Sequence, residues 1–370
     1  MDRRDFCKHL GALGAMTSAS QLMFAQQVEA SVSRKKEDLI WAYLIHLGYN
    51  LWEDYTWKGY EMDHYPANFS EAEVRKWAHM FRPNLTCEED VWDRVIEHLA
   101  KSGANMVMID LADGLRYKTH PEIAVKGAWT PDLLKKKLDK IRSLGMEPIP
   151  KLNFSTCHKA WTGEYQYCVS SKYYYRFCQD LIEETYDLFD HPRFVHLGMD
   201  EETAANQQGL GTQYTVVRSG DLWWHDFLFL VDIVEKLGAR AWIWSDYYWH
   251  NPELFISKMP KSVLQSNWNY YPDLGFDTND QPVQTGAKTF VDLEKYGFDQ
   301  VPTGSLWRNS REWNNDLNFD CLVKHNKRII APERLKGFMQ TIWTPTLKPC
   351  EQSHYRAANL IAEARKRYFS

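Results

Sequence analysis

The 370-residue sequence lacks the features of a nucleic-acid binder or a membrane protein. Lys and Arg number 44 against 49 Asp and Glu, so the formal net charge is −5 and no basic excess is present. The sequence has no run of about 18 apolar residues, the minimum for a membrane-spanning helix. No Pro/Ser-rich linker or shift in composition divides the chain, so we expect one main domain.

Closely spaced cysteine pairs are missing as well. The seven cysteines stand singly at positions 7, 87, 157, 168, 178, 321 and 350. Because no CxxC pair or zinc-type spacing occurs, we expect neither a metal site nor a cofactor. Disulfides could form among the last six cysteines, but the sequence does not indicate which would pair.

Aromatic residues, in contrast, are abundant. The sequence contains 16 Trp, 20 Tyr and 17 Phe, which together make up 14% of the chain. A hydrophobic fraction of 44% with 25% charged residues is typical of a globular protein. Sixteen tryptophans are more than a core usually needs, and a flat apolar ring with one polar edge suits a sugar ring.

Residues 1–30 have the character of a targeting segment. The basic stretch Arg3 to Lys8, reading RRDFCK, precedes a weakly apolar stretch from Leu10 to Ala25 and resembles a twin-arginine export signal. We therefore expect export to the periplasm or cell envelope, with the folded domain spanning residues 31–370. A disordered basic N-terminus is the alternative.

The rest of the chain repeats a unit made of a helix, a glycine and a short apolar strand. Thr130, followed by proline, predicts the start of a helix that ends at Gly145 and leads into the apolar run Met146–Leu152. Thr86, with Glu89 three residues later, predicts a capping box at the start of a similar helix.

Short apolar runs that can form strands occur eight times. They lie at 39–47, 104–111, 146–152, 194–198, 239–244, 263–268, 300–305 and 337–343. Runs without polar alternation are typical of strands buried on both faces, as in a parallel sheet. The repeat therefore predicts an α/β fold, a single (β/α)8 TIM barrel with long loops at its C-terminal face.

Carboxylates and tryptophans gather where these strands end, which is where a TIM barrel places its active site. The residues at or after the strand ends are Asp110, Asp113, Asn153, His158, Asp200, Glu201, Glu202, Asp246, Asn267, Trp268, Trp307, Arg308, Asn309 and Trp343. We expect them to form a polar mouth with tryptophan walls, although some could cap helices instead. His196 is expected to be a buried structural group, and Glu202 to begin a loop or helix.

The segment from Phe194 to Glu201, reading FVHLGMDE, resembles the His-x-Gly-x-Asp-Glu signature of glycoside hydrolase family 20, the β-N-acetylhexosaminidases. Its Asp-Glu pair closes the predicted fourth strand, and neighbouring segments match in the right order. The resemblance covers about residues 39–345, which is the whole predicted barrel.

The neighbouring segments differ from the family at two charged positions. Asn105–Gly114 is similar to the family's Asn-x-x-His-x-His-Leu-x-Asp block, with Asp110 in place of a histidine. Residues 129–158 look like its next helix, strand and turn, with Lys151 in place of a glutamate. The sequence Trp-Ser-Asp at 244–246 resembles the end of strand five.

The resemblance implies a retaining glycosidase in which the substrate's own 2-acetamido oxygen attacks the anomeric carbon. Glu201 would be the general acid and base, and Asp200 would orient the acetamide. Asp113 and His158 would be a hydrogen-bonding pair near Glu201. We expect the remaining contacts with the sugar to come from Trp244, Asp246, Trp268, Trp307, Arg308 and Trp343.

Several substrate-reading residues of the family are missing. No arginine ends the first strand, which reads IHLGY at 45–49, and neither tyrosine nor carboxylate occurs in Trp307-Arg308-Asn309 after strand seven. Trp343 is followed by Thr-Pro where the family has glutamate. Arg308 could supply a positive charge in their place. A site that lost these groups should have an unusual specificity, since unpaired polar groups reject a substrate.

Three functions therefore stay open. The first is an exo-acting hexosaminidase-like hydrolase with substrate assistance. The second is a glycosidase of the same fold with a carboxylate nucleophile, for which Asp246 is the candidate. The third is a non-catalytic sugar-binding barrel. In each case the expected partner is a carbohydrate, and the sequence predicts no oligomeric state.

Overall fold

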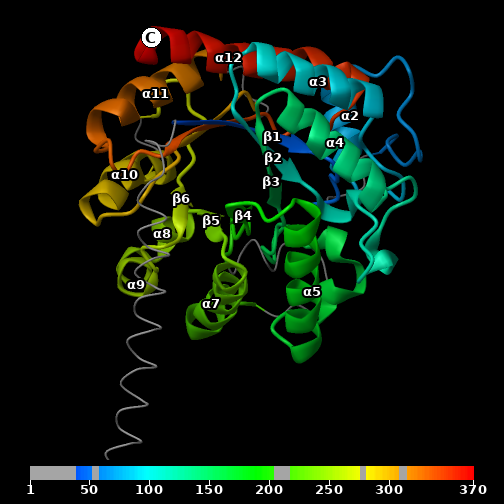
Figure 1. Ribbon diagram of the computed structural model, residues 1–370, viewed down its shortest axis with the longest axis horizontal. Helices are drawn as coiled ribbons and strands as arrows, with labels where there is room; N and C mark the ends of the chain where they lie inside the picture. Colours follow the sequence, from blue (N-terminus) through cyan, green and yellow to red (C-terminus); the bar gives the residue numbers. More distant parts are fainter. Residues whose placement is uncertain (1–38, 52–57, 204–216, 276–280, 308–314) are drawn as a thin grey trace, which may run out of the picture. The chain divides into compact units, whose positions relative to one another are not determined.

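The structure is a computed structural model and describes residues 39–51, 58–203, 217–275, 281–307 and 315–370. Its contacts divide the chain into Met1–Leu39 and Ile40–Ser370. The second unit contains all the helices and strands discussed below (Figure 1). The predicted export signal at residues 1–30 lies outside the described residues.

Eight parallel strands form the sheet in the order β6-β5-β4-β3-β2-β1-β8-β7. They are β1 (Ile40–His46), β2 (Met106–Asp110), β3 (Glu147–Lys151), β4 (Phe194–His196), β5 (Arg240–Trp244), β6 (Leu264–Ser266), β7 (Thr303–Ser305) and β8 (Gly337–Thr341). The ring closes between β6 and β7, where Val301 N donates to Gln265 O at 2.8 Å and Thr303 N to Asn267 O at 3.0 Å. Each strand lies within a predicted run, so the predicted TIM barrel is confirmed.

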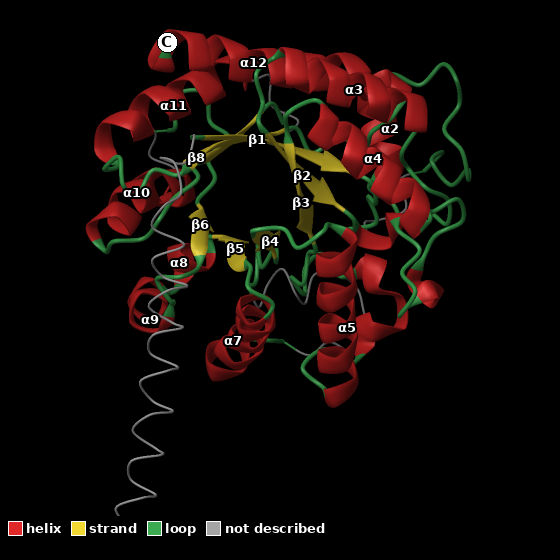
Figure 2. Ribbon diagram, viewed as in Figure 1, coloured by secondary structure: helices red, strands yellow, loops and turns green. Residues whose placement is uncertain are grey.

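Helices surround the strand ring (Figure 2). They are α2 (Glu71–Ala78), α3 (Glu89–Lys101), α4 (Pro131–Ser143), α5 (Lys172–Leu188), α7 (Gly220–Lys236), α8 (Tyr247–His250), α9 (Pro252–Lys258), α10 (Gln281–Lys295), α11 (Asn318–Ile329) and α12 (Glu351–Phe369). Short 3₁₀ turns lie at Ala112–Gly114, Pro121–Ile123, Ala160–Tyr167, Asn315–Leu317 and Lys348–Cys350. The last helix, α12, packs against α3 and α11, so the end of the chain completes the outer layer (Figure 1).

The local helix signals were right for α4 and wrong for α3. Thr130 caps α4 as predicted, since its side chain accepts from Leu133 N at 3.2 Å. The predicted capping box at Thr86 does not form: α3 follows Glu88, whose side chain makes no cap hydrogen bond. Tertiary contacts determine this start instead, because Glu88 N donates to Thr346 O at 2.9 Å and Thr86 is buried.

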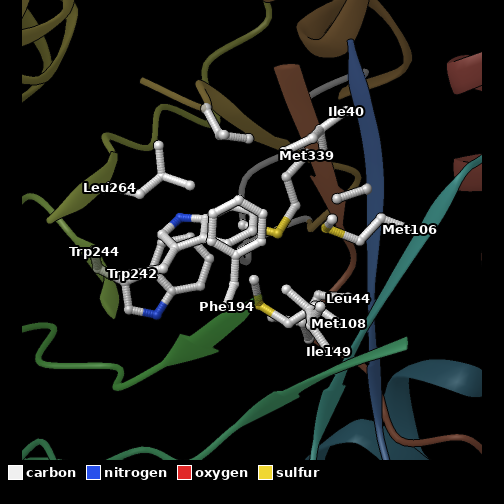
Figure 3. Packing of buried hydrophobic residues seen from close by; sticks show 12 residues of the cluster. Ile40, Leu44, Met106, Met108, Ile149, Phe194, Trp242, Trp244, Leu264 and Met339 are labelled. Carbon is white, nitrogen blue, oxygen red and sulfur yellow. The ribbon is translucent and has the colours of Figure 1, made fainter. Parts of the chain in front are cut away.

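Apolar side chains fill the barrel interior (Figure 3). The cluster consists of Ile40, Ala42, Leu44, Met106, Met108, Ile149, Phe194, Trp242, Trp244, Leu264, Val301 and Met339. Alternate residues of a strand point to the same side, which explains why every second residue of β1 and β2 contributes. Trp268 and Trp343 pack against this cluster and are partly exposed on their other side, so the core continues into the mouth of the barrel.

A buried polar layer lies at the ends of β1 to β4. Its members are in register, with His46 beside Asp110, Asp110 beside Lys151, and Lys151 beside His196. Lys151 Nζ donates to Asp110 Oδ2 at 2.5 Å, and His46 Nδ1 lies 3.5 Å from the same oxygen. Burial opposes ionisation of Asp110, but Lys151 and His46 hold its pKa below the usual range. Asp110 and Lys151, which stand in place of a histidine and a glutamate in the family's pattern, thus form one ion pair. His196 is buried, as predicted.

The six cysteines within the described ranges, from Cys87 to Cys350, form no disulfide. The same ranges contain no cluster of three or more His, Cys, Asp or Glu side chains placed to hold a metal ion. Among the described helices, none has the length and apolar character needed to cross a bilayer.

Candidate functional site

A pocket of about 210 Å³ lies at the C-terminal ends of the strands. Its lining consists of His79, His158, Asp200, Glu201, Trp244, Trp268, Tyr270, Trp307 and Trp343. The structure therefore brings both predicted catalytic carboxylates together with His158 and with all of the predicted tryptophans.

Two predicted site residues within the described ranges, Asp113 and Asp246, do not line this pocket. Asp113 is buried, and its Oδ2 accepts from Asn50 Nδ2 at 2.7 Å. Burial raises the pKa of Asp113 to about 8, against the hydrogen bond from Asn50. Asp246 is also buried, behind the pocket wall. Arg308 and its neighbour Asn309 lie outside the described residues.

Two lining residues were missed by the sequence analysis. Tyr270 lies only two positions after Trp268, so residues just beyond the predicted sixth strand also belong to the mouth of the barrel. Its hydroxyl accepts from Trp343 Nε1 at 2.9 Å. His79 lies directly after α2, far from any strand end in the sequence, so no local signal pointed to it.

The turn that carries the carboxylate pair has an unusual backbone. Gly198, Met199 and Glu201 have φ values of 75°, 71° and 55°, in the left-handed region. At Gly198 only glycine fits, because a Cβ would lie 2.1 Å from Asn153 Oδ1. Left-handed conformations cost about 1–3 kcal/mol for other residue types and persist only when the surroundings enforce them.

Side chains of the loop after β3 fix this turn. Ser155 Oγ donates to Asp200 O at 2.5 Å, and Cys157 Sγ donates to Glu201 O at 2.8 Å. On the opposite side, Asp246 Oδ2 accepts from Glu201 N at 2.8 Å. The backbone of both carboxylate residues is thus held from two neighbouring strands, which explains how the strained turn persists.

Glu202, expected to begin a loop or helix, anchors the turn through a buried ion pair. Its Oε1 lies 2.5 Å from an Arg218 guanidinium nitrogen, and both side chains are 0% exposed. Arg218 also lies 3.4 Å from Asp226 Oδ2 and donates to Phe154 O at 2.7 Å. Glu202 further accepts from Thr156 N at 2.8 Å. The loops after β3 and β4 are therefore joined to the start of α7.

His158 connects the two carboxylates of the pair. Its Nε2 lies 3.2 Å from Asp200 Oδ2 and 3.3 Å from Glu201 Oε2. Burial disfavours the imidazolium, but Asp200 and Glu201 outweigh it and raise the pKa of His158 to about 10. Burial also opposes the Asp200 charge, but His158 and a hydrogen bond from Asn153 hold the pKa of Asp200 well below its usual range. At neutral pH His158 and Asp200 are therefore both charged.

The two carboxylates differ in access to the pocket. The Asp200 side chain is 13% exposed, whereas that of Glu201 is 47% exposed. A shielded, ionised carboxylate is suited to stabilise a developing positive charge, and an accessible one is suited to exchange protons with a ligand. The geometry thus separates two chemical roles between adjacent residues.

The other walls of the pocket are aromatic. The ring centroids of Trp244 and Trp343 lie 5.8 Å apart at 58°. Trp268 stacks on Tyr270 with a centroid distance of 5.0 Å and an angle of 24°. Trp343 has a φ of 51°, and its carbonyl accepts from Tyr49 Oη at 2.8 Å, which fixes its place in the wall.

The charged His158 predicts a specific pH dependence of stability. The pKa of His158 is raised on folding, so its stabilising contribution is complete below about pH 6.5 and is lost as pH rises towards about 10. The free energy of unfolding of the wild type should therefore fall more between about pH 6 and pH 9.5 than that of His158→Gln. Denaturant titrations at both pH values measure this difference.

An exposed histidine provides the control for this experiment. The His191 side chain is 65% exposed, so His191→Gln should keep the pH dependence of the wild type. Parallel stability curves for the wild type and His158→Gln would contradict a charged His158 in the folded protein.

The sequence matches no family model and no curated protein. The structure, however, is similar to solved ones. A Bacteroides fragilis β-N-acetylhexosaminidase aligns with a TM-score of 0.55 at 11% identity, covering 87% of this chain and 65% of that one. A Vibrio harveyi family 20 exo-β-N-acetylglucosaminidase, solved with N-acetylglucosamine, gives 0.52 at 14%, covering 90% and 57%. Dispersin B gives 0.53 at 16%, covering 78% and 96%.

The chain thus spans less than two thirds of the length of the first two structures, at 65% and 57%. Identities of 11–16% describe a shared architecture and leave the chemistry of this site to be argued from its own residues. The fold of this chain is a divergent barrel of the kind found in the family 20 β-N-acetylhexosaminidases.

Proposed function

We propose that the chain is an exo-acting glycoside hydrolase of the β-N-acetylhexosaminidase type, which retains configuration by substrate assistance. The observation that carries this proposal is the Asp200–Glu201 pair at the pocket, bridged by His158 and faced by tryptophan walls. We also propose that the protein is exported, on the basis of the Arg3-Arg4 segment alone.

Glu201 is the general acid and base in this proposal. Its half-exposed carboxyl group faces the pocket, where it can protonate the glycosidic oxygen and later accept a proton from water. The proton moves from Glu201 to the leaving oxygen as the bond to the anomeric carbon breaks. In the second step, water attacks the same carbon while its proton returns to Glu201.

Asp200 acts on the substrate's acetamide group. Its ionised carboxylate accepts a hydrogen bond from the acetamide N–H and so directs the acetamide oxygen towards the anomeric carbon. As the oxygen forms its bond, positive charge develops on the acetamide nitrogen, and the nearby carboxylate stabilises it. His158 and Asn153 hold Asp200 in its ionised state and fixed orientation.

The tryptophan walls support a sugar as the ligand. Trp268 and Trp343 are partly exposed and present apolar surfaces that suit the C–H faces of a pyranose, and the buried Trp244 packs against Trp343. A pocket of about 210 Å³ is smaller than the cavities of about 300–1,000 Å³ that hold drug-sized ligands, and it suits one monosaccharide. This size favours action at the end of a glycan chain.

The position of Asp246 argues against a protein nucleophile. Asp246 is 3% exposed, and its Oδ1 and Oδ2 accept from Trp268 Nε1 at 3.1 Å and from Glu201 N at 2.8 Å. A nucleophile needs a free oxygen directed at the anomeric carbon. The Asp246 carboxyl group would have to break a buried hydrogen bond to provide one.

A panel of aryl glycosides tests the proposal. Aryl 2-acetamido-2-deoxyglycosides should be hydrolysed with retention, analogues with a plain 2-hydroxyl should react at least about 100-fold more slowly, and a thiazoline mimic of the cyclised intermediate should inhibit competitively. Trapping of a covalent glycosyl-enzyme would contradict substrate assistance. Sugar binding by calorimetry without hydrolysis over days would indicate a non-catalytic barrel.

A further inference from the structure

The carboxylate of Asp246 lies between the backbone of Glu201 and the indole of Trp268. Asp246 lies two residues past the end of β5, which is next to β4 in the sheet. Its Oδ2 accepts from Glu201 N at 2.8 Å and its Oδ1 accepts from Trp268 Nε1 at 3.1 Å. Each oxygen therefore has its own donor, and the two donors belong to different walls of one pocket.

Glu201 lies beyond the end of β4, so its N–H is not part of the strand ladder. Strand β4 ends at His196, five residues earlier, and Glu201 has a φ of 55°. A residue other than glycine keeps such a conformation only when its surroundings compensate the cost. A charge-assisted hydrogen bond to a buried carboxylate is about twice as strong as a neutral one and gives that compensation.

The ring of Trp268 is fixed at its indole nitrogen by the same carboxylate. The ring also stacks on Tyr270 and lies 4.5 Å, between centroids, from Trp249. These ring contacts restrain its tilt, and the bond from Nε1 to Asp246 sets which edge of the indole faces the pocket. The orientation of this wall thus depends on the group that holds Glu201.

We propose that Asp246 is a positioning residue that couples the backbone of Glu201 to the sugar-facing wall at Trp268. The inference rests on the proposed function, since it assigns Asp246 a role at that same site. Asp246 does not touch the substrate. It acts by accepting two hydrogen bonds at once, so that the acid group and the wall keep one relative geometry.

The test uses the difference between a carboxylate and an amide. Asparagine has the shape of aspartate but only one acceptor oxygen, so in Asp246→Asn an amide NH₂ must face one of the two donors. This leaves one buried donor unmatched, and Asp246→Asn should therefore lower kcat about 10–100-fold. The assay is run at about pH 8, where the carboxyl group of Asp246, with a pKa raised by burial to about 7, is mainly ionised.

A second substitution should relieve this conflict. Trp268→Phe removes the indole donor, so the asparagine in Asp246→Asn/Trp268→Phe can turn its NH₂ to the phenyl ring and its oxygen to Glu201 N. We expect Trp268→Phe mainly to raise KM. The double variant should have a kcat within about 3-fold of Trp268→Phe alone, which is strongly sub-additive. If the fold losses in kcat of the two single variants multiply in the double variant, the proposal is wrong.

Trp249 offers a matched control for the rescue. Its Nε1 donates to Asn267 Oδ1 at 3.0 Å, so Trp249→Phe removes a neighbouring indole donor that does not contact Asp246. Trp249→Phe should not restore kcat to Asp246→Asn. Equal rescue by both phenylalanine substitutions would show a general effect of a smaller ring and would also overturn the proposal.

A measurement that needs no activity separates this inference from the proposed function. The Trp268 indole N–H resonance is identified by its loss from the NMR spectrum of Trp268→Phe, and it should move upfield in Asp246→Asn. If the resonance does not move in Asp246→Asn, the proposed coupling is wrong, even if the wild type hydrolyses glycosides. If the resonance moves but the wild type hydrolyses none, the coupling stands and only the proposed hydrolase function is wrong. If Asp246→Asn folds poorly, recovery of folding in the double variant is the expected result, and no recovery counts against the proposal.

Discussion

Replacing Glu201 with glutamine is expected to lower kcat on an aryl 2-acetamido glycoside by about 10²–10⁴-fold, the usual contribution of a general acid and base. Glutamine keeps the size of the side chain and its place at the pocket but has no proton to donate to the leaving oxygen. KM should change little, because the walls that hold the sugar stay intact. Steady-state kinetics with the purified variant measure both constants.

The size of the loss in kcat should also depend on the leaving group. A phenol of high pKa needs protonation as it departs, whereas a nitrophenol of low pKa departs readily without it. The loss in Glu201→Gln should therefore be larger for phenyl than for dinitrophenyl glycosides. Glu253→Gln, at an exposed position on α9, is the matched control and should match the wild type. Equal turnover by the wild type and Glu201→Gln would remove Glu201 from the mechanism.

Replacing Arg218 with methionine is expected to cost about 3–5 kcal/mol in the free energy of unfolding. The guanidinium lies between the carboxylates of Glu202 and Asp226, all with side chains at most 1% exposed. Among the described residues, Arg218 is the one positive partner of these two carboxylates. Its removal would leave negative charge buried without compensation, which is far more costly than losing a surface pair. Chemical denaturation, followed by tryptophan fluorescence, measures the change.

Two further variants test the cause of this loss in the free energy of unfolding. Glu202→Gln in the Arg218→Met background removes one of the stranded charges and should recover part of the stability. Lys236→Met breaks a pair on α7 in which Lys236 is 73% exposed and Asp232 is 55% exposed, and it should cost at most about 1 kcal/mol. A stability of Arg218→Met within about 1 kcal/mol of the wild type would contradict a net stabilising role for the buried network.

The Arg218 variant should also affect catalysis if it folds. Glu202 directly follows Glu201, and its partners Thr156 and Arg218 connect it to the loop that carries His158. Loosening this loop changes the distance of 3.3 Å between His158 and Glu201. The effect on kcat in Arg218→Met should therefore exceed that in Lys236→Met, even under conditions where both proteins are folded.

The sequence by itself predicted the barrel because the signals for strands are local. Each strand lies in a short apolar run, and the helix at Thr130 begins at its own capping residue. The Asp200–Glu201 pair could be found because it lies within five residues of the end of β4 and in a compact motif. Tryptophans at the strand ends were placed correctly for the same reason, since parallel strands bring their C-terminal ends to one edge.

Only the tertiary structure decided which side chains meet. Lys151 and Asp110 are 41 positions apart, and Glu201 and Asp246 are 45 apart. Such pairs depend on the register between neighbouring strands, which periodicity along one strand does not specify. The false capping box at Thr86 has the same cause, because a distant segment at Thr346 supplies the contacts that fix the start of α3. Local sequence determined the elements of this protein, and long-range packing determined the partners that make its pocket.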